Sequence, residues 1–211
     1  MKSCRIHLVG ASGSGVTSLG RALADTLAIP HHDTDDYFWQ PTVPPYQKKR
    51  ERTERLRLMQ EVFLPRADWI LSGSIEGWGD DIIPHFDLAI FLSTPREIRL
   101  RRLRAREAAH FGADAVAPGG WRHRDTEDFV EWASHYEDGD REGRSLAKHT
   151  AWLAALPCAA SRRIAAFPGA GRGMPCRARP CYTIAISDTK NEGGKRCSRD
   201  AVFCSPPLPP E

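Results

Sequence analysis

The chain has 211 residues, 41% of them hydrophobic, which is enough for one domain with a sizeable core. No apolar run approaches the roughly 20 residues of a transmembrane helix, and no signal-peptide pattern is present, so we expect a cytoplasmic protein without membrane contact. The net charge of +3 divides into +5 for residues 158–211 and −2 for the rest. The main body is therefore not basic, and we expect no nucleic-acid partner for it.

Cysteine usage argues against a metal or disulfide framework. Cys4 is the single cysteine of the first 157 residues. The others are Cys158, Cys176, Cys181, Cys197 and Cys204. They form no C-x-x-C pair and no histidine follows His149, so a zinc site is not expected. The irregular set is not typical of a disulfide scaffold in a cytoplasmic protein.

Short apolar runs alternate with helical periodicities along the first 157 residues. The predicted strands are residues 6–9, 31–33, 69–72 and 87–92. The predicted helices are residues 16–27, 48–64, 95–110, 129–136 and 145–156. The second helix would have Leu56, Met59, Gln60 and Phe63 on one face, while residues 40–45 are extended and 112–120 form a Gly/Ala loop. This alternation predicts an α/β fold with a parallel sheet flanked by helices.

The chain changes character after Pro157. Residues 158–211 contain five cysteines, seven prolines and one leucine, without convincing periodicity. Short strands could form at 162–167 and 182–186. We predict two parts, a nucleotide-binding domain over residues 1–157 and a divergent, poorly ordered tail over residues 158–211.

Residues 10–17, Gly-Ala-Ser-Gly-Ser-Gly-Val-Thr, match a phosphate-binding loop (P-loop) in which Val16 replaces the lysine. The template G-x-x-x-x-G-K-[ST] fits Gly10, Gly15 and Thr17, and the loop lies between a strand and a helix as required. Backbone N–H groups of such a loop bind phosphate oxygens, and the Thr17 hydroxyl would ligate Mg²⁺. The predicted nucleotide-binding residues are Gly10, Ser12, Gly13, Ser14, Gly15, Val16, Thr17 and Ser18. The alternative is a Gly-rich turn without a ligand.

An acidic cluster, Asp33-Thr34-Asp35-Asp36, follows the second predicted strand directly. In a doubly wound sheet this strand end faces the crevice that holds the P-loop. Asp33 could assist Mg²⁺, and Asp35 could orient a substrate hydroxyl or accept its proton. The alternative is an N-cap cluster for the next helix, a position that aspartate favours.

The helix after the fourth predicted strand is rich in arginine. Arg99, Arg102 and Arg106 share one helical face and could supply, from a lid, the positive charge that the missing lysine does not. Arg102 and Arg106 are the predicted catalytic arginines, and Arg141 and Arg144 are weaker candidates of the same kind. The alternative is a solvated helix face paired with neighbouring glutamates.

The end of the third predicted strand is a candidate substrate-binding segment. Gly73 would let a substrate approach the backbone, and Trp39 and Trp78 could form a wall of the pocket. The alternative for the two tryptophans is ordinary packing in the core.

With these residues in view, the chain resembles the small P-loop kinases of the shikimate kinase and adenylate kinase group over residues 3–157. The resemblance lies in Gly10–Gly20, followed by the Asp33-Thr34-Asp35 segment, and in residues 69–78, 87–92, 99–107, 129–136 and 144–152. It implies a P-loop NTPase fold, a three-layer sandwich with a five-stranded parallel sheet and an Arg-bearing lid. It also implies that Asp33 works near Mg²⁺, that Asp35 holds a substrate hydroxyl, and that relatives lacking the lysine form a subfamily.

The chain departs from that pattern after Leu156, where relatives have a fifth strand, an adenine-contacting loop and a last helix. A frameshifted or otherwise divergent C-terminus is our hypothesis for residues 158–211.

These features predict a monomeric enzyme that transfers the γ-phosphate of ATP, with Mg²⁺, to a hydroxyl or phosphate of a small-molecule substrate. Two alternatives remain open. The loss of the lysine at position 16 favours a nucleotide-binding protein with little or no catalysis. The basic tail would favour a DNA-associated regulator.

Overall fold

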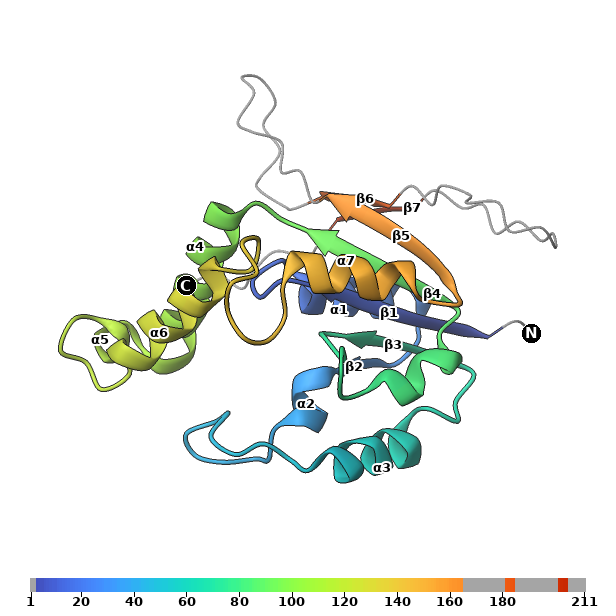
Figure 1. Cartoon of the computed structure of the whole chain (residues 1–211), viewed down its shortest axis with the longest axis horizontal. Helices are drawn as coiled ribbons and strands as arrows, with labels where there is room; N and C mark the ends of the chain where they lie inside the picture. The colour runs from blue at the N-terminus through green and yellow to red at the C-terminus, as the bar shows by residue number, and fades with distance from the viewer. Residues whose placement is uncertain (1–2, 165–180, 185–200, 205–211) are drawn as a thin grey trace, which may run out of the picture.

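The computed structural model describes residues 3–164, 181–184 and 201–204 (Figure 1). Five parallel strands form the main sheet in the order β2-β3-β1-β4-β5. Their bounds are β1 Cys4–Gly10, β2 His31–Asp33, β3 Asp68–Ser72, β4 Leu88–Ser93 and β5 Ala159–Ile164. The predicted α/β class, with its parallel sheet, is confirmed.

The helices connect successive strands, as parallel pairing requires. Their bounds are α1 Val16–Leu27, α2 Thr34–Phe38, α3 Arg52–Val62, α4 Arg96–Phe111, α5 Ala113–Val116, α6 His123–Ser134, α7 Leu146–Ala154 and the 3-10 helix η1 Asp80–His85. None of the helices described is long and apolar enough to span a membrane. Helices α4, α5 and α6 form an arm at one end of the sheet (Figure 1).

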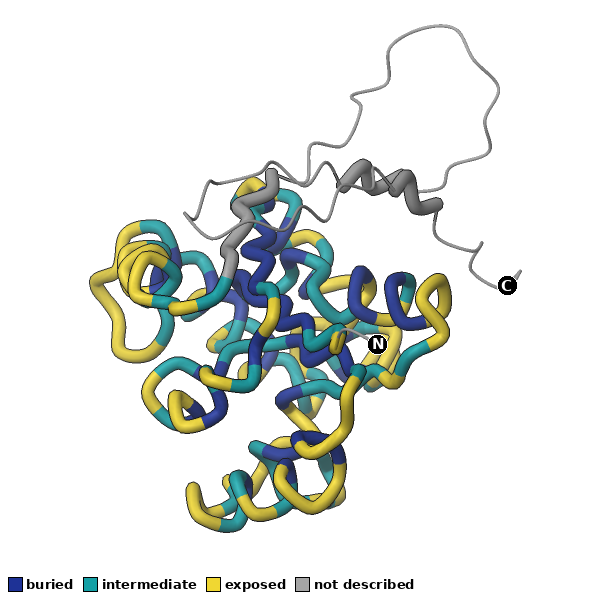
Figure 2. Tube along the Cα trace, turned by 90° about the vertical axis from the view of Figure 1, so that its right-hand side faces the viewer, coloured by how far each residue is buried: buried dark blue, intermediate teal, exposed yellow. Residues whose placement is uncertain are grey.

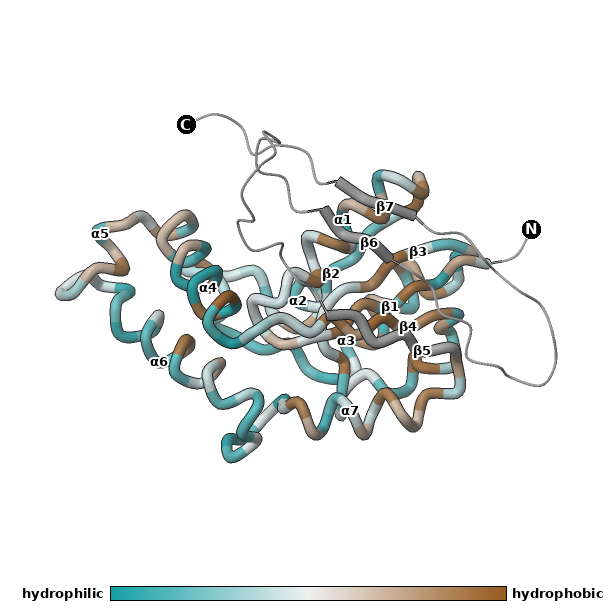
Figure 3. Tube along the Cα trace, turned by 90° about the horizontal axis from the view of Figure 1, so that it is seen from above, coloured by the Kyte–Doolittle hydropathy of each residue, from teal (hydrophilic) through white to brown (hydrophobic). Residues whose placement is uncertain are grey.

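Two hydrophobic clusters cover the two faces of the sheet. Along β3, Ile70 packs in the cluster that includes Leu8 and α1, whereas Trp69 and Leu71 pack in the cluster with Met59 of α3. This alternation follows from the two-residue period of a strand and produces three layers. Most residues of β1, β3 and β4 are buried, and buried tube runs through the centre of the molecule in Figure 2. The α4–α6 arm is largely hydrophilic in Figure 3.

Helix α3 is shorter than predicted. It begins at Arg52 rather than Lys48, because Arg50 N donates to Phe38 O (2.8 Å) and holds this segment beside α2. Of the predicted face, Met59 and Phe63 are buried and Gln60 is exposed, and Arg55 is buried as well. Arg55 stacks 3.8 Å from the Phe38 ring centre, so an aromatic partner makes a buried arginine possible here.

The other boundaries differ by a few residues. Helix α6 begins at His123, earlier than predicted, and α5 interrupts the predicted Gly/Ala loop. The first residues of the predicted tail form β5, which pairs with β4 along its whole length. The predicted strand at 182–186 is β6 (Cys181–Ile184), antiparallel to β7 (Ala201–Cys204). The rest of the predicted tail, residues 165–180, 185–200 and 205–211, lies outside the described residues.

Candidate active site

The predicted P-loop connects β1 to α1 at the carboxyl edge of the sheet. Gly13 and Gly15 have φ values of 79° and 100°, a region that glycine adopts at little cost. A side chain on Gly13 would stand 2.6 Å from Arg99 O, so the loop is packed against the backbone of α4. The loop is compact, and the first N–H groups of α1, beginning at Val16, have no partners within their own helix.

The P-loop meets the acidic cluster through one short hydrogen bond. Thr17 Oγ1 donates to Asp33 Oδ2 at 2.8 Å, although the two residues come from different strand–helix connections. The other Asp33 oxygen accepts Asp35 N at 3.0 Å, which makes Asp33 the N-cap of α2. The capping and functional interpretations of Asp33 are therefore compatible, because each uses a different oxygen.

Val16 occupies the lysine position, where its partly buried side chain packs against the hydrophobic cluster of Leu8 and Leu19. Arg102 contacts the loop, because its guanidinium donates to Ser14 O at 3.2 Å. A second contact, to Gly13 O, is longer at 3.4 Å. A predicted catalytic arginine thus lies against the P-loop.

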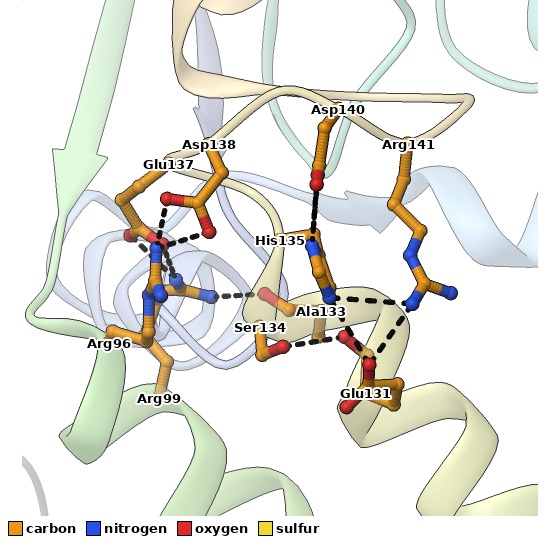
Figure 4. Close-up of polar contacts among 10 residues, drawn as sticks. All are labelled: Arg96, Arg99, Glu131, Ala133, Ser134, His135, Glu137, Asp138, Asp140 and Arg141. Carbon is orange, nitrogen blue, oxygen red and sulfur yellow. Dashed lines mark hydrogen bonds and ion pairs between the residues drawn. The ribbon is translucent and has the colours of Figure 1, made fainter.

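Arg99 is not a charge donor for a substrate, contrary to its predicted place on the lid face. Its side chain is fully buried and donates to Ser12 O (3.3 Å) and Ala133 O (3.3 Å). It also makes two bonds to Glu137, at 2.6 and 2.7 Å (Figure 4). Arg99 therefore joins the P-loop to the end of α6. The helical spacing of the arginines could not show that Arg99 is buried.

The positive charges of Arg106 and Arg144 affect the pKa of Asp35. Asp35 is accessible to solvent, yet surrounding protein removes enough water to raise its pKa, and the Asp33 charge raises it further. Arg144 and Arg106 act in the opposite direction. Burial lowers the pKa of Arg144, and the charge of Asp35 partly offsets this effect. Both arginines therefore lie close enough to Asp35 to favour its ionised form.

Arg141, the other weak candidate, is engaged elsewhere. It donates to Glu131 at 3.0 Å in a surface network with His135 and Asp140 (Figure 4). Within the described chain Arg144 has no carboxylate within 4.0 Å, and its guanidinium lies over the Trp132 ring at 5.5 Å. Arg144 is therefore the stronger candidate of the two.

Gly73 has a structural role that the sequence prediction missed. Its φ is 114°, and a Cβ at this position would overlap the Thr34 side chain. The space beside Gly73 is therefore filled by Thr34 of α2. Contact between a substrate and Gly73 remains an untested prediction. The Trp78 ring meets Phe38 edge to face (5.7 Å between ring centres) and its Nε1 donates to Ser74 O (3.1 Å), so the ring is packed within the fold.

A buried histidine holds the loop after β3 against α7, and sequence reasoning missed it. His149 is fully buried between the Ser74 hydroxyl (3.1 Å) and the Tyr136 hydroxyl (2.8 Å). Burial lowers its pKa to about 4, with a smaller contribution from Arg144, so the ring is neutral at pH 7. Nothing in the spacing of these three residues could have identified the contact.

The described residues contain no group of three or more His, Cys, Asp or Glu side chains that could hold a metal by themselves. Thr17 and Asp33 nevertheless present oxygen atoms side by side at the P-loop. Mg²⁺ in phosphate sites is usually held by one or two protein oxygens together with phosphates and water. The oxygen donors present fit such an ion when a nucleotide is bound.

Comparison with known proteins gives one clear relative. No protein-family profile matches the chain. "Uncharacterized protein YqaC" of Bacillus subtilis (strain 168) is 44% identical over 153 residues, which is 72% of this chain and 84% of that protein.

The solved structures that resemble the chain include small kinases. Shikimate kinase from Bacteroides thetaiotaomicron is 26% identical, with a TM-score of 0.36 over 48% of this chain and 63% of that chain. A gluconokinase from Sinorhizobium meliloti 1021 is 21% identical, with a TM-score of 0.39 over 49% of this chain and 65% of that chain. The chain therefore spans less than two thirds of these two structures.

A third solved structure is covered more fully. Shikimate kinase from Acinetobacter baumannii in complex with shikimate is 21% identical, with a TM-score of 0.39 over 71% of this chain and 89% of that chain. Since all three TM-scores are below 0.5, the function has to be argued from the residues of this chain.

Proposed function

The chain belongs to the family of YqaC, and we propose that it is a Mg²⁺-dependent P-loop kinase that transfers the γ-phosphate of ATP to a small-molecule acceptor. Residues 10–18 bind the phosphates, and Asp35 orients the acceptor and takes up its proton. Residues 1–157 would carry the groups for this activity as a monomer, and residues 158–211 would be a divergent tail whose first residues add β5 to the sheet.

The 2.8 Å hydrogen bond between Thr17 Oγ1 and Asp33 Oδ2 carries the proposal. It brings the hydroxyl at the Mg²⁺ position of the P-loop motif beside a carboxylate from the next strand. These two oxygens would hold Mg²⁺, which neutralises charge on the phosphates when it is bound. If residues 10–17 formed only a Gly-rich turn without a ligand, the turn would not require a threonine hydroxyl beside an aspartate carboxylate.

Positive charge on the phosphates would come from arginine rather than lysine. Arg102 lies against the P-loop, and Arg106 lies one helical turn further along α4. Arginine can replace lysine as a source of charge, because its guanidinium stays protonated and donates several hydrogen bonds. We therefore propose that the chain belongs to a subfamily of P-loop kinases that lacks the loop lysine.

A matched pair of threonine variants on α1 tests the proposal. Thr17→Ala removes the hydroxyl beside Asp33, whereas Thr26→Ala removes a hydroxyl that bonds only Ala22 O of its own helix (2.8 Å). Binding of ATP with Mg²⁺ is measured by calorimetry, and ADP formation with candidate acceptors by a coupled assay. We expect Thr17→Ala to lower Mg²⁺-dependent ATP affinity and turnover at least tenfold, and Thr26→Ala to change neither appreciably.

The packing of Val16 into the hydrophobic cluster favours a second candidate, a nucleotide-binding protein with little or no catalysis. The two candidates differ in one readout. Mg·ATP binding without any acceptor-stimulated ADP formation would establish the second candidate and reject the kinase. Failure to bind Mg·ATP would reject both.

A further inference from the structure

Three side chains join the end of α6 to the loop after β3, and we call them the polar bridge. The Tyr136 hydroxyl lies 2.8 Å from His149 Nδ1, and His149 Nε2 lies 3.1 Å from the Ser74 hydroxyl. Tyr136 is 6% exposed and His149 is fully buried. A neutral imidazole carries one N–H, so it accepts a hydrogen bond from one hydroxyl and donates one to the other. The polar bridge is therefore a continuous run of hydrogen bonds through the interior.

One end of the polar bridge is held by Arg99, which also contacts the P-loop. The Arg99 guanidinium lies 5.3 Å from the centre of the Tyr136 ring, and it bonds the next residue, Glu137, at 2.6 and 2.7 Å (Figure 4). The same guanidinium donates to Ser12 O at 3.3 Å. The carbonyl of Ser12 and the N–H of Gly13 belong to one planar peptide group, so a bond that fixes the carbonyl also orients the N–H. Arg99 thus connects the polar bridge to a peptide group of the proposed phosphate site.

The other end of the polar bridge is the loop after β3, residues 73–78, to which Ser74 belongs. Gly73 of this loop approaches α2 so closely that a Cβ at this position would overlap the Thr34 side chain. Thr34 directly precedes Asp35, which orients the acceptor in the proposed function. The loop therefore packs against the acidic cluster, and its position would affect the proposed acceptor site.

The polar bridge transmits position better than apolar packing would. Hydrogen bonds depend steeply on distance and angle, whereas apolar side chains retain contact when they slide past one another. Burying polar groups is costly unless each of them has a partner. Loss of either hydroxyl would leave His149 with an unpaired buried nitrogen, so the members of the polar bridge depend on one another.

From these contacts we infer that Tyr136 and His149 are positioning residues that connect Arg99 at the P-loop to the loop after β3, so that Mg·ATP at the P-loop stabilises this loop beside the acceptor site. The inference rests on the proposed binding of Mg·ATP and adds to it a coupling between the nucleotide and acceptor sites. Such coupling is reciprocal, so an acceptor held at this loop would in turn strengthen nucleotide binding.

Hydrogen exchange of backbone amides, followed by mass spectrometry on the full chain, tests the coupling because it reports local opening. Exchange is measured in peptides that cover residues 10–18 and residues 73–78, without ligand and with saturating Mg·ATP. The ratio of the two rates is compared within each variant, so a change in baseline stability cancels. Slower exchange in residues 10–18 reports that the nucleotide is bound.

Matched tyrosine variants isolate the polar bridge. Tyr136→Phe removes its hydroxyl and keeps the ring beside Arg99. Tyr37→Phe is the control, because Tyr37 is also 6% exposed and its hydroxyl lies 3.0 Å from the Nδ1 of another histidine, His32, outside the polar bridge. Ser74→Ala breaks the polar bridge at its other end, and it serves as the test if Tyr136→Phe does not fold.

We expect Mg·ATP to slow exchange in residues 73–78 about tenfold in the wild type and in Tyr37→Phe, the effect of stabilisation by roughly one hydrogen bond. Tyr136→Phe and Ser74→Ala should lose most of this slowing in residues 73–78. Both variants should keep the slowing in residues 10–18, because Arg99 still contacts the P-loop.

The remaining outcomes separate this inference from the proposed function. Slower exchange in residues 10–18 of the wild type, without any change in residues 73–78, would overturn the inference and leave nucleotide binding in place. Undiminished slowing of residues 73–78 in Tyr136→Phe and Ser74→Ala would likewise overturn it, since the nucleotide would then act on the loop by another route. An equal loss in Tyr37→Phe would overturn it as well, because the effect would not depend on the polar bridge. Unchanged exchange in both segments, with no binding heat for Mg·ATP, would reject the proposed function and the inference together.

Discussion

Replacing Arg99 by alanine should destabilise the protein far more than any exposed arginine of the same helix. The guanidinium is fully buried and donates to three carbonyl oxygens, those of Thr94 (3.2 Å), Ser12 (3.3 Å) and Ala133 (3.3 Å). Two further bonds reach Glu137 at 2.6 and 2.7 Å. Arg99→Ala therefore removes five hydrogen bonds and leaves a cavity between the P-loop and α6.

The magnitude follows from what the variant leaves behind. Removing one partner of a buried ion pair costs about 3–5 kcal/mol, mainly because the other charge stays buried. Glu137 is 31% exposed and keeps its bond to Arg96 (3.2 Å), so water and Arg96 can compensate part of that loss. The carbonyls left without a donor each add about 1 kcal/mol unless water reaches them. We expect a total loss of roughly 4 kcal/mol in the free energy of unfolding.

Urea unfolding followed by circular dichroism measures this loss, with Arg104→Ala as the matched control. Arg104 lies on the same helix and also bonds a glutamate, Glu127, but both side chains are about half exposed. Such an exposed pair contributes below about 1 kcal/mol. If Arg99→Ala lost no more stability than Arg104→Ala, the idea that Arg99 anchors the P-loop would be wrong.

Three further predictions concern the P-loop, the acidic cluster and pH. Val16→Lys should raise the rate of ADP formation less than about tenfold if arginines already supply the positive charge. A gain of about a hundredfold would refute the idea that the arginines compensate for the missing loop lysine. Gly73→Ala should lower the free energy of unfolding by roughly 2–4 kcal/mol, because it combines a positive φ with overlap of Thr34, and urea unfolding measures it. Hydrogen bonds to two carboxylates hold the pKa of His135 above its usual value, so protonated His135 stabilises the folded state. This contribution to the free energy of unfolding is fully present below about pH 6.5 and is lost as pH rises through the folded-state pKa. A melting-temperature profile from pH 5 to 9 should therefore show this decline in the wild type and not in His135→Gln; parallel profiles would contradict it.

The strand–loop–helix order around the P-loop could be predicted because each part has a local signal. Residues 6–9 form a short, mostly apolar run that ends at Gly10, and Leu19 and Leu23 recur at helical spacing. Gly13 and Gly15 then supply the backbone conformations that the loop requires. Local periodicity and glycine position are properties of the sequence itself, so this part of the fold was predicted correctly.

The partners of buried polar groups could not be predicted in the same way. Arg99 bonds Glu137, which lies 38 residues further along the chain, and His149 bonds Ser74, which lies 75 residues away. Charge and helical spacing identify an arginine-rich face but not which of its members is buried.

On the proposed function, Arg102 and Arg106 would supply the positive charge that a loop lysine supplies elsewhere, and Arg99 would hold their helix in place. Arg99 fixes α4 to the P-loop through Ser12 O, so the helix cannot move away without breaking buried bonds. Arg102, one turn later, contacts Ser14 O of the loop. Arg106, a further turn along, lies near enough to Asp35 to affect its pKa. Because a helix fixes the spacing of these residues, anchoring the first also positions the other two, and this makes a rigid source of charge possible with valine at position 16.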